Sequence, residues 1–138
     1  MKSLSLHEAA RLPLHDADFI ALEIKPQDDG GVTVMIKLKV HPDEKEGLSK
    51  ITGTEELDIS LIFQDCLLAS NSISGICSGQ ETIDDFTLIE NSELLNEINS
   101  TWKRSYRCFH FHFDGSHGSK IDILTNSVAV GLRWDVRK

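Results

Sequence analysis

The sequence lacks basic residues over its whole middle third. From position 51 to position 102 there is no lysine or arginine, but there are ten acidic residues: Glu55, Glu56, Asp58, Asp65, Glu81, Asp84, Asp85, Glu90, Glu93 and Glu97. The remaining residues hold all 14 bases and 12 of the 22 acids, so the ends are slightly basic within a net charge of −8. This balance opposes binding to nucleic acid and favours a basic partner, although an acidic face also simply keeps a protein soluble.

Cysteines and long apolar runs are also scarce. The three cysteines, Cys66, Cys77 and Cys108, form no C-x-x-C pair, so they predict neither a disulfide framework nor a thiolate zinc site. No apolar run exceeds four residues, whereas about 20 are needed to cross a bilayer. Charged residues interrupt the N-terminal stretch where a secretory signal would be apolar. We therefore expect a cytoplasmic protein with reduced cysteines and no membrane contact.

Alternation of apolar and polar residues is the main structural signal, and it is typical of strands with one buried face. The alternating segments are 18–25, 32–40, 57–64, 82–90, 106–114, 121–123 and 128–134. Turn residues at 26–31 predict that the first two strands form an antiparallel hairpin. Segment 41–54 is polar and is expected to be an exposed connection, and 66–80 to hold one short irregular strand.

Two short helices are predicted from capping signals. Ser5 and Glu8 have the S-x-x-E spacing of a capping box, which predicts a helix over 6–12. Asn91 or Ser92 is expected to cap a second helix over 93–101. We therefore predict a single domain, 1–138, that is mainly β with two short helices and is built as an antiparallel β-sandwich or an open barrel-like meander.

The stretch "RCFHFHFDGSHG", 107–118, offers the one candidate metal site. Alternation should place Phe109, Phe111 and Phe113 on one face of a strand, and His110 and His112 on the other, solvated face. Histidines two residues apart on a strand can share a zinc or iron ion, with His117 as a third ligand from the following turn. A metal-dependent enzyme that uses these three histidines is therefore an alternative reading. Since alternation alone explains the pattern, we expect no metal or other cofactor.

Four segments carry a resemblance to a known group of proteins: "LPLHDADFIALEI", "GVTVMIKLKV", "ELDISLIFQDC" and "FHFHFDGSHGSKIDILTNSVAV". Together they resemble small all-β bacterial proteins encoded beside toxin genes, many of them assigned as immunity proteins of polymorphic or contact-dependent toxin systems. The resemblance covers most of the chain and consists of strand patterns. It implies a binding role and carries over no catalytic residue.

Charge and resemblance lead to the same functional expectation. Nuclease toxins are basic because they hold phosphates, so an inhibitor benefits from an acidic surface that speeds capture. The residues expected to contact such a partner are Asp84, Asp85, Glu90, Glu93, Glu97 and Trp102. We expect a non-catalytic protein-binding module. More specifically, we expect an immunity protein that neutralises a basic toxin. A β domain with a housekeeping role is the remaining alternative, and the sequence does not determine the oligomeric state.

Overall fold

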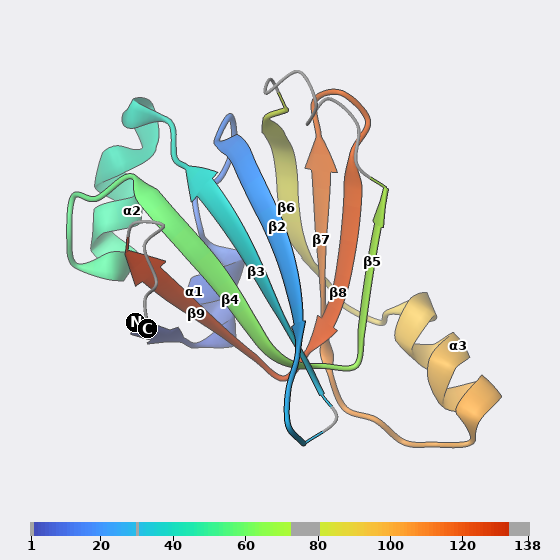
Figure 1. Cartoon of the computed structure of the whole chain (residues 1–138). Helices are drawn as coiled ribbons and strands as arrows, with labels where there is room; N and C mark the ends of the chain where they lie inside the picture. The colour runs from blue at the N-terminus through green and yellow to red at the C-terminus, as the bar shows by residue number, and fades with distance from the viewer. Residues whose placement is uncertain (1, 30, 73–80, 133–138) are drawn as a thin grey trace.

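Two antiparallel sheets pack face to face in the computed structural model of the chain (Figure 1). The structure describes residues 2–29, 31–72 and 81–132, with the backbone alone for 68–72. The first sheet has the order β1 (Lys2–Leu4), β9 (Ser127–Leu132), β4 (Asp58–Cys66), β3 (Val32–Lys39) and β2 (Asp18–Pro26). The second has the order β5 (Leu68–Ser72), β8 (Lys120–Thr125), β7 (Phe109–Gly115) and β6 (Ile83–Ile89). The predicted fold class, mainly β with antiparallel strands, is confirmed.

A cluster of phenylalanines joins the two sheets. Phe63 of β4 meets Phe111 and Phe113 of β7, with ring centroids 5.7 and 6.3 Å apart. Phe86 of β6 stacks on Phe111 at 5.5 Å and an interplanar angle of 8°. Aromatic pairs in such arrangements add to the stabilisation from burial alone. The core therefore lies between the sheets, and the opposite face of β7 points outward.

The chain passes directly from one sheet to the other at two places. β4 leads into β5 through Leu67, and β8 leads into β9 through Asn126. The Leu67 amide donates to the Leu124 carbonyl at 2.8 Å, which ties the two crossings together. Along another edge, a bridge between Asp18 and Thr82 connects β2 to the start of β6. These connections fix the position of one sheet against the other.

The helices differ in part from the prediction. α1 (Leu6–Ala10) begins at the predicted capping box of Ser5, and α3 (Glu93–Trp102) begins at Ser92. The polar segment that was expected to be a connection instead contains a 3-10 turn (Pro42–Glu44) and a further helix, α2 (Lys45–Thr52). The prediction failed there because α2 has a narrow apolar face, on which Leu48 is buried in the core. None of the helices in the described ranges is long and apolar enough to cross a membrane.

Burial departs from simple alternation in several strands, β2 and β7 among them. β2 has a register shift between Phe19 and Ala21, so Phe19 is buried and Ile20, expected on the buried face, is exposed. Phe109 begins β7 and is 41% exposed, whereas the other two phenylalanines of that strand are buried as predicted. The expected strand segments at 73–80 and 133–134 lie outside the described residues. A bulge and a strand end are the places where alternation predicts burial least well.

Replacement of Phe111 by alanine should therefore lower the free energy of unfolding by about 3–5 kcal/mol, because the fully buried ring contacts rings from both sheets. Phe109→Ala is the matched control on the same strand and should cost well under half of that. Urea unfolding followed by circular dichroism measures both changes. Equal losses in the two variants would contradict the assigned core.

Candidate functional site

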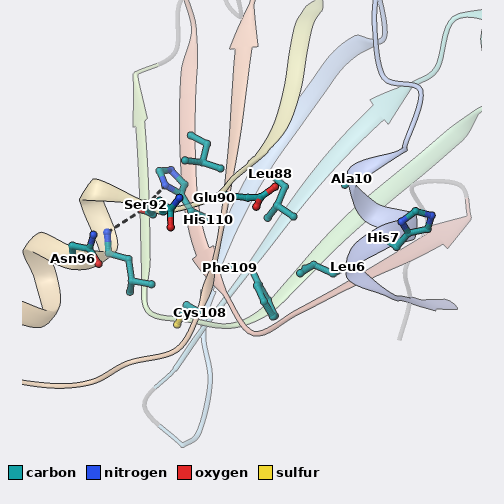
Figure 2. A pocket seen from close by; sticks show the side chains of 13 residues that line it. Leu6, His7, Ala10, Leu88, Glu90, Ser92, Asn96, Cys108, Phe109 and His110 are labelled. Atoms are coloured by element: carbon teal, nitrogen blue, oxygen red, sulfur yellow. Dashed lines mark hydrogen bonds between the residues drawn. The ribbon is translucent and has the colours of Figure 1, made fainter.

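The candidate site is a pocket at one end of the second sheet, with a volume of about 630 Å³. It lies between α1, the end of β6, the start of α3 and the start of β7 (Figure 2). Figure 2 shows Leu6, Leu88 and Phe109 on one side of the pocket and Ser92, Asn96 and His110 on the other. The pocket therefore combines an apolar wall with a polar wall, a combination typical of binding sites.

The polar wall is held together by a chain of hydrogen bonds. Ser92 Oγ accepts from the Leu95 amide at 3.0 Å, and this bond caps α3. The same Oγ lies 2.8 Å from His110 Nδ1, and His110 Nε2 lies 2.7 Å from Asp122 Oδ1. The start of α3 is thereby linked to the outer face of β7 and β8 through one imidazole ring.

His112 extends this network along β7. Its Nδ1 lies 2.7 Å from Asp122 Oδ1 and its Nε2 lies 3.0 Å from Asp114 Oδ1. Because an ionised carboxylate can only accept, both ring nitrogens donate and the cationic imidazolium is favoured. Burial lowers the pKa of His112, but the bonds to Asp122 and Asp114 outweigh burial and raise the pKa above its ordinary value.

The pKa values of Asp122 and Asp114 shift in the opposite direction to that of His112. Burial raises the pKa of Asp122, while the bonds from His110 and His112 more than compensate, so the pKa is lowered overall. The pKa of Asp114 is lowered chiefly by the Lys120 ammonium, whose Nζ lies 3.0 Å from Oδ1, with a further contribution from His112. The outer face of the second sheet therefore carries a compact array of alternating charges.

Ser92, His110 and Asp122 have the connectivity of a hydrolase relay, in which a base accepts the proton of a nucleophilic hydroxyl. Two features make this relay a poor nucleophile system. Ser92 is 7% exposed, and its Oγ already accepts the capping bond from α3. Asp122 Oδ1 also bonds to His112, so this carboxylate oxygen is shared and does not serve His110 alone. The arrangement is better suited to hold α3 on the sheet.

The histidine prediction is corrected by this geometry. His110 was expected on a solvated face, but it is 6% exposed because the start of α3 covers it. His112 is partly buried between two carboxylates, and His117 lies elsewhere, 3.4 Å from Glu81 Oε1. Within the described ranges, no three His, Cys, Asp or Glu side chains gather in a way that could hold a metal ion. The three histidines therefore do not form the shared site of the alternative reading.

Glu81 is the centre of a second polar cluster, at the opposite end of the second sheet. It is 1% exposed, and the turn between β7 and β8 wraps around its carboxylate. The His117 amide donates at 2.8 Å, the Ser116 hydroxyl at 3.0 Å, and the Ser119 hydroxyl also donates. A Cβ on Gly115 would come within 2.6 Å of Glu81 Cδ, so glycine leaves room for this carboxylate.

These bonds decide the charge state of Glu81. Burial alone raises its pKa, but donation from Ser119, His117 and Ser116 reverses this effect and lowers the pKa to about 2. A carboxylate that accepts several hydrogen bonds remains ionised even when buried. Glu81 therefore anchors the turn and does not belong to the acidic surface expected from the sequence.

The structure separates the predicted partner-binding residues into two groups. Asp84 and Asp85 lie at the start of β6 and Glu90 follows its end, which places them about 20 Å apart at ~3.3 Å per residue. Glu93 and Glu97 are exposed one turn apart on α3, close in sequence to Glu90. The acidic residues thus form a pair at one end of β6 and a group of three at the other.

Trp102 ends α3 and is 50% exposed. It lies nine residues after Glu93, about half a turn away around the helix axis, so it belongs to the helix face of Leu95 and Ile98. Its ring meets that of Tyr106 edge to face, at 6.1 Å and 81°. Trp102 is therefore exposed on the side of α3 opposite Glu93, and its role as an anchor stays a prediction.

Three residues of these clusters were missed by the sequence reasoning as site residues: Ser92, Asp122 and Glu81. Asp122 could have been found, because antiparallel pairing of β7 with β8 places it directly opposite His112. Ser92 was expected as a helix cap, but its bond to His110 depends on where α3 packs. Glu81 carries no local signal, since its donors come from a turn more than 30 residues later.

Comparisons with protein-family models, with curated proteins and with solved structures found no match for this chain. The site is therefore interpreted from its own geometry.

The position of His112 between two carboxylates predicts a pKa above about 6.5 in a proton NMR titration of its ring signals. Since the folded pKa is the higher one, the stabilisation is complete below about pH 6.5 and is lost as the pH rises through the folded pKa. Asp122→Asn should lower the pKa of His112, because it replaces a negative acceptor by a neutral one. Asp43→Asn, beside His41, is the control and should leave the His112 titration unchanged. A wild-type His112 that titrates below 6.5 would contradict this network.

Glu81→Gln should lower the free energy of unfolding at pH 7 by about 3 kcal/mol, the energy equivalent of a pKa lowered from 4.5 to about 2. Because the folded pKa is the lower one, wild-type protein has this stability above about pH 4.5 and loses it as the pH falls towards 2. In urea unfolding, the free energy of unfolding of the variant should change less with pH over that range. Glu97 is an exposed carboxylate, so Glu97→Gln should noticeably change neither the free energy of unfolding nor its dependence on pH. If the free energies of unfolding of wild type and Glu81→Gln change with pH in the same way, Glu81 does not anchor the turn between β7 and β8.

Proposed function

We propose that this chain is a non-catalytic binding module that captures a basic protein, and that it serves as an immunity protein against a bacterial toxin. The acidic face of α3 is the observation that carries this proposal. Glu93 and Glu97 are exposed on this face and Glu90 is exposed shortly before the helix, and within the described part of the chain none of the three forms an ion pair. In Figure 1 this helix stands away from the second sheet, so a large protein can reach it.

Unpaired carboxylates of one sign create a field that steers oppositely charged molecules. Glu55 contributes less to such a field, since it is paired with Lys45 at 3.1 Å. Electrostatic steering acts on the rate of association more than on the final affinity. An inhibitor that must intercept a toxin before it reaches its target benefits from this kind of acceleration.

The polar network supports a role in binding rather than in chemistry. It fixes the start of α3 to the outer face of the second sheet through His110 and Asp122. A helix held in one orientation presents its acidic face without a large entropy cost on binding. The hydroxyl that would act as nucleophile is buried and engaged as a cap.

The double variant Glu93→Lys/Glu97→Lys should slow capture of the toxin domain encoded beside this gene by about tenfold or more at low ionic strength. Stopped-flow fluorescence with that purified domain measures the association rate, and the deficit should shrink as salt is added. Asp84→Lys/Asp85→Lys tests the other acidic group, with the same change in net charge.

Asp43→Lys/Glu46→Lys, on the 3-10 turn and α2, is the matched control and should slow association least. If all three double variants behave alike, the steering depends on net charge and not on α3. Survival of cells that produce the toxin domain together with this chain tests the biological role. A toxin domain from the neighbouring reading frame that neither binds nor is neutralised would refute the immunity proposal.

A further inference from the structure

A second cavity, with a volume of about 600 Å³, lies beyond α3 at the end of the sandwich where the chain crosses between sheets. One side is formed by Trp102 at the end of α3 and by Tyr106 and Cys108 of the connection to β7. The turn between β2 and β3 contributes Asp29, and the end of β4 contributes Asp65. Segments distant in sequence thus place two aromatic rings and two carboxylates around one space.

The aromatic pair gives the cavity a face that attracts cations. Trp102 and Tyr106 lie edge to face, with centroids 6.1 Å apart, and they are among the most exposed large apolar side chains of the described residues. A bidentate side-chain contact supports this loop, since Asn99 both donates to and accepts from the Tyr106 backbone, at 3.1 and 2.8 Å. The negative face of an aromatic ring, best in tryptophan, attracts guanidinium and ammonium groups.

The carboxylates are held in place by neutral donors. Asp65 Oδ1 accepts from Gln27 Nε2 at 3.0 Å, and Asp29 Oδ1 accepts from the Gly31 amide at 3.1 Å. Within the described part of the chain, neither carboxylate forms an ion pair. Each therefore keeps an oxygen that can accept a further hydrogen bond.

Basic residues of the same connection do not occupy the cavity. Lys103, Arg104 and Arg107 are exposed near the aromatic pair, and none of them is among the residues that line the space. Among the described residues, the lining includes no lysine or arginine. No described lysine or arginine of the chain therefore pairs with the two aspartates, whose charge suits a cationic group.

We propose that this cavity binds an arginine side chain of the protein partner. The inference rests on the proposed function, because that partner is basic. A guanidinium is planar and carries five N–H donors, so it can stack on an aromatic ring and donate to carboxylates at its edge. The cavity adds to the steering surface of α3 a specific anchor point for one residue of the partner.

The test uses the whole chain and two short peptides, acetyl-Gly-Arg-Gly-amide and the same peptide with neutral citrulline in place of arginine. The indole N–H signal of Trp102 in a ¹⁵N-correlated NMR spectrum, assigned by its loss in Trp102→Phe, reports on the cavity. We expect the arginine peptide to shift this signal saturably, and the citrulline peptide to shift it far less. Equal shifts with both peptides would overturn the proposal.

The double variant Asp29→Asn/Asp65→Asn keeps the acceptor oxygens and removes the charge, so it should weaken binding of the arginine peptide by about three- to tenfold. Asp43→Asn/Glu46→Gln changes the net charge equally on a different part of the molecule and should bind like wild type. Equal weakening in the two double variants would also overturn the proposal. The peptide experiment contains no toxin. If the chain binds the arginine peptide as expected but fails to capture the toxin domain, the proposed function is refuted and the arginine cavity is not.

Discussion

Contact between Phe63 in one sheet and Phe111 and Phe113 in the other is the interaction on which the rest of the structure depends. It assigns one face of β7 to the core, so every second residue of that strand must point outward. His110 and His112 are those residues, and antiparallel pairing with β8 brings Asp122 between them. The capping serine of α3 then bonds to His110, and this bond places the acidic helix. A hydrophobic contact thus determines the position of a charged surface.

The sequence predicts the parts of this arrangement that depend on local alternation and local capping. The antiparallel hairpin of β2 and β3, the buried faces of β3 and β4, and the caps at Ser5 and Ser92 all follow from residues close to one another in sequence. The helix at 45–52 was missed because tertiary packing of Leu48, and not its polar composition, stabilises it. Burial of His110 and of Glu81 was missed for a related reason, since segments far along the chain cover them.

Charge counts from sequence treat all acidic residues alike, and the structure distinguishes them. Glu81 is a buried anchor, Glu55 is neutralised by a lysine, and Asp65 lies beside the aromatic pair. Within 81–102, the exposed carboxylates without an ion pair lie at the start of β6 and around α3. A strongly acidic segment therefore combines structural and surface roles, and the surface roles emerge only once the fold is known.

Cys108 lies on the wall of both cavities, the one at the start of α3 and the one beyond its end. The two spaces thus share one lining residue, directly before β7 begins. A group that shifted Cys108 in one cavity would also change the lining of the other. A partner that fills both cavities would therefore contact the same residue, Cys108, in each of them.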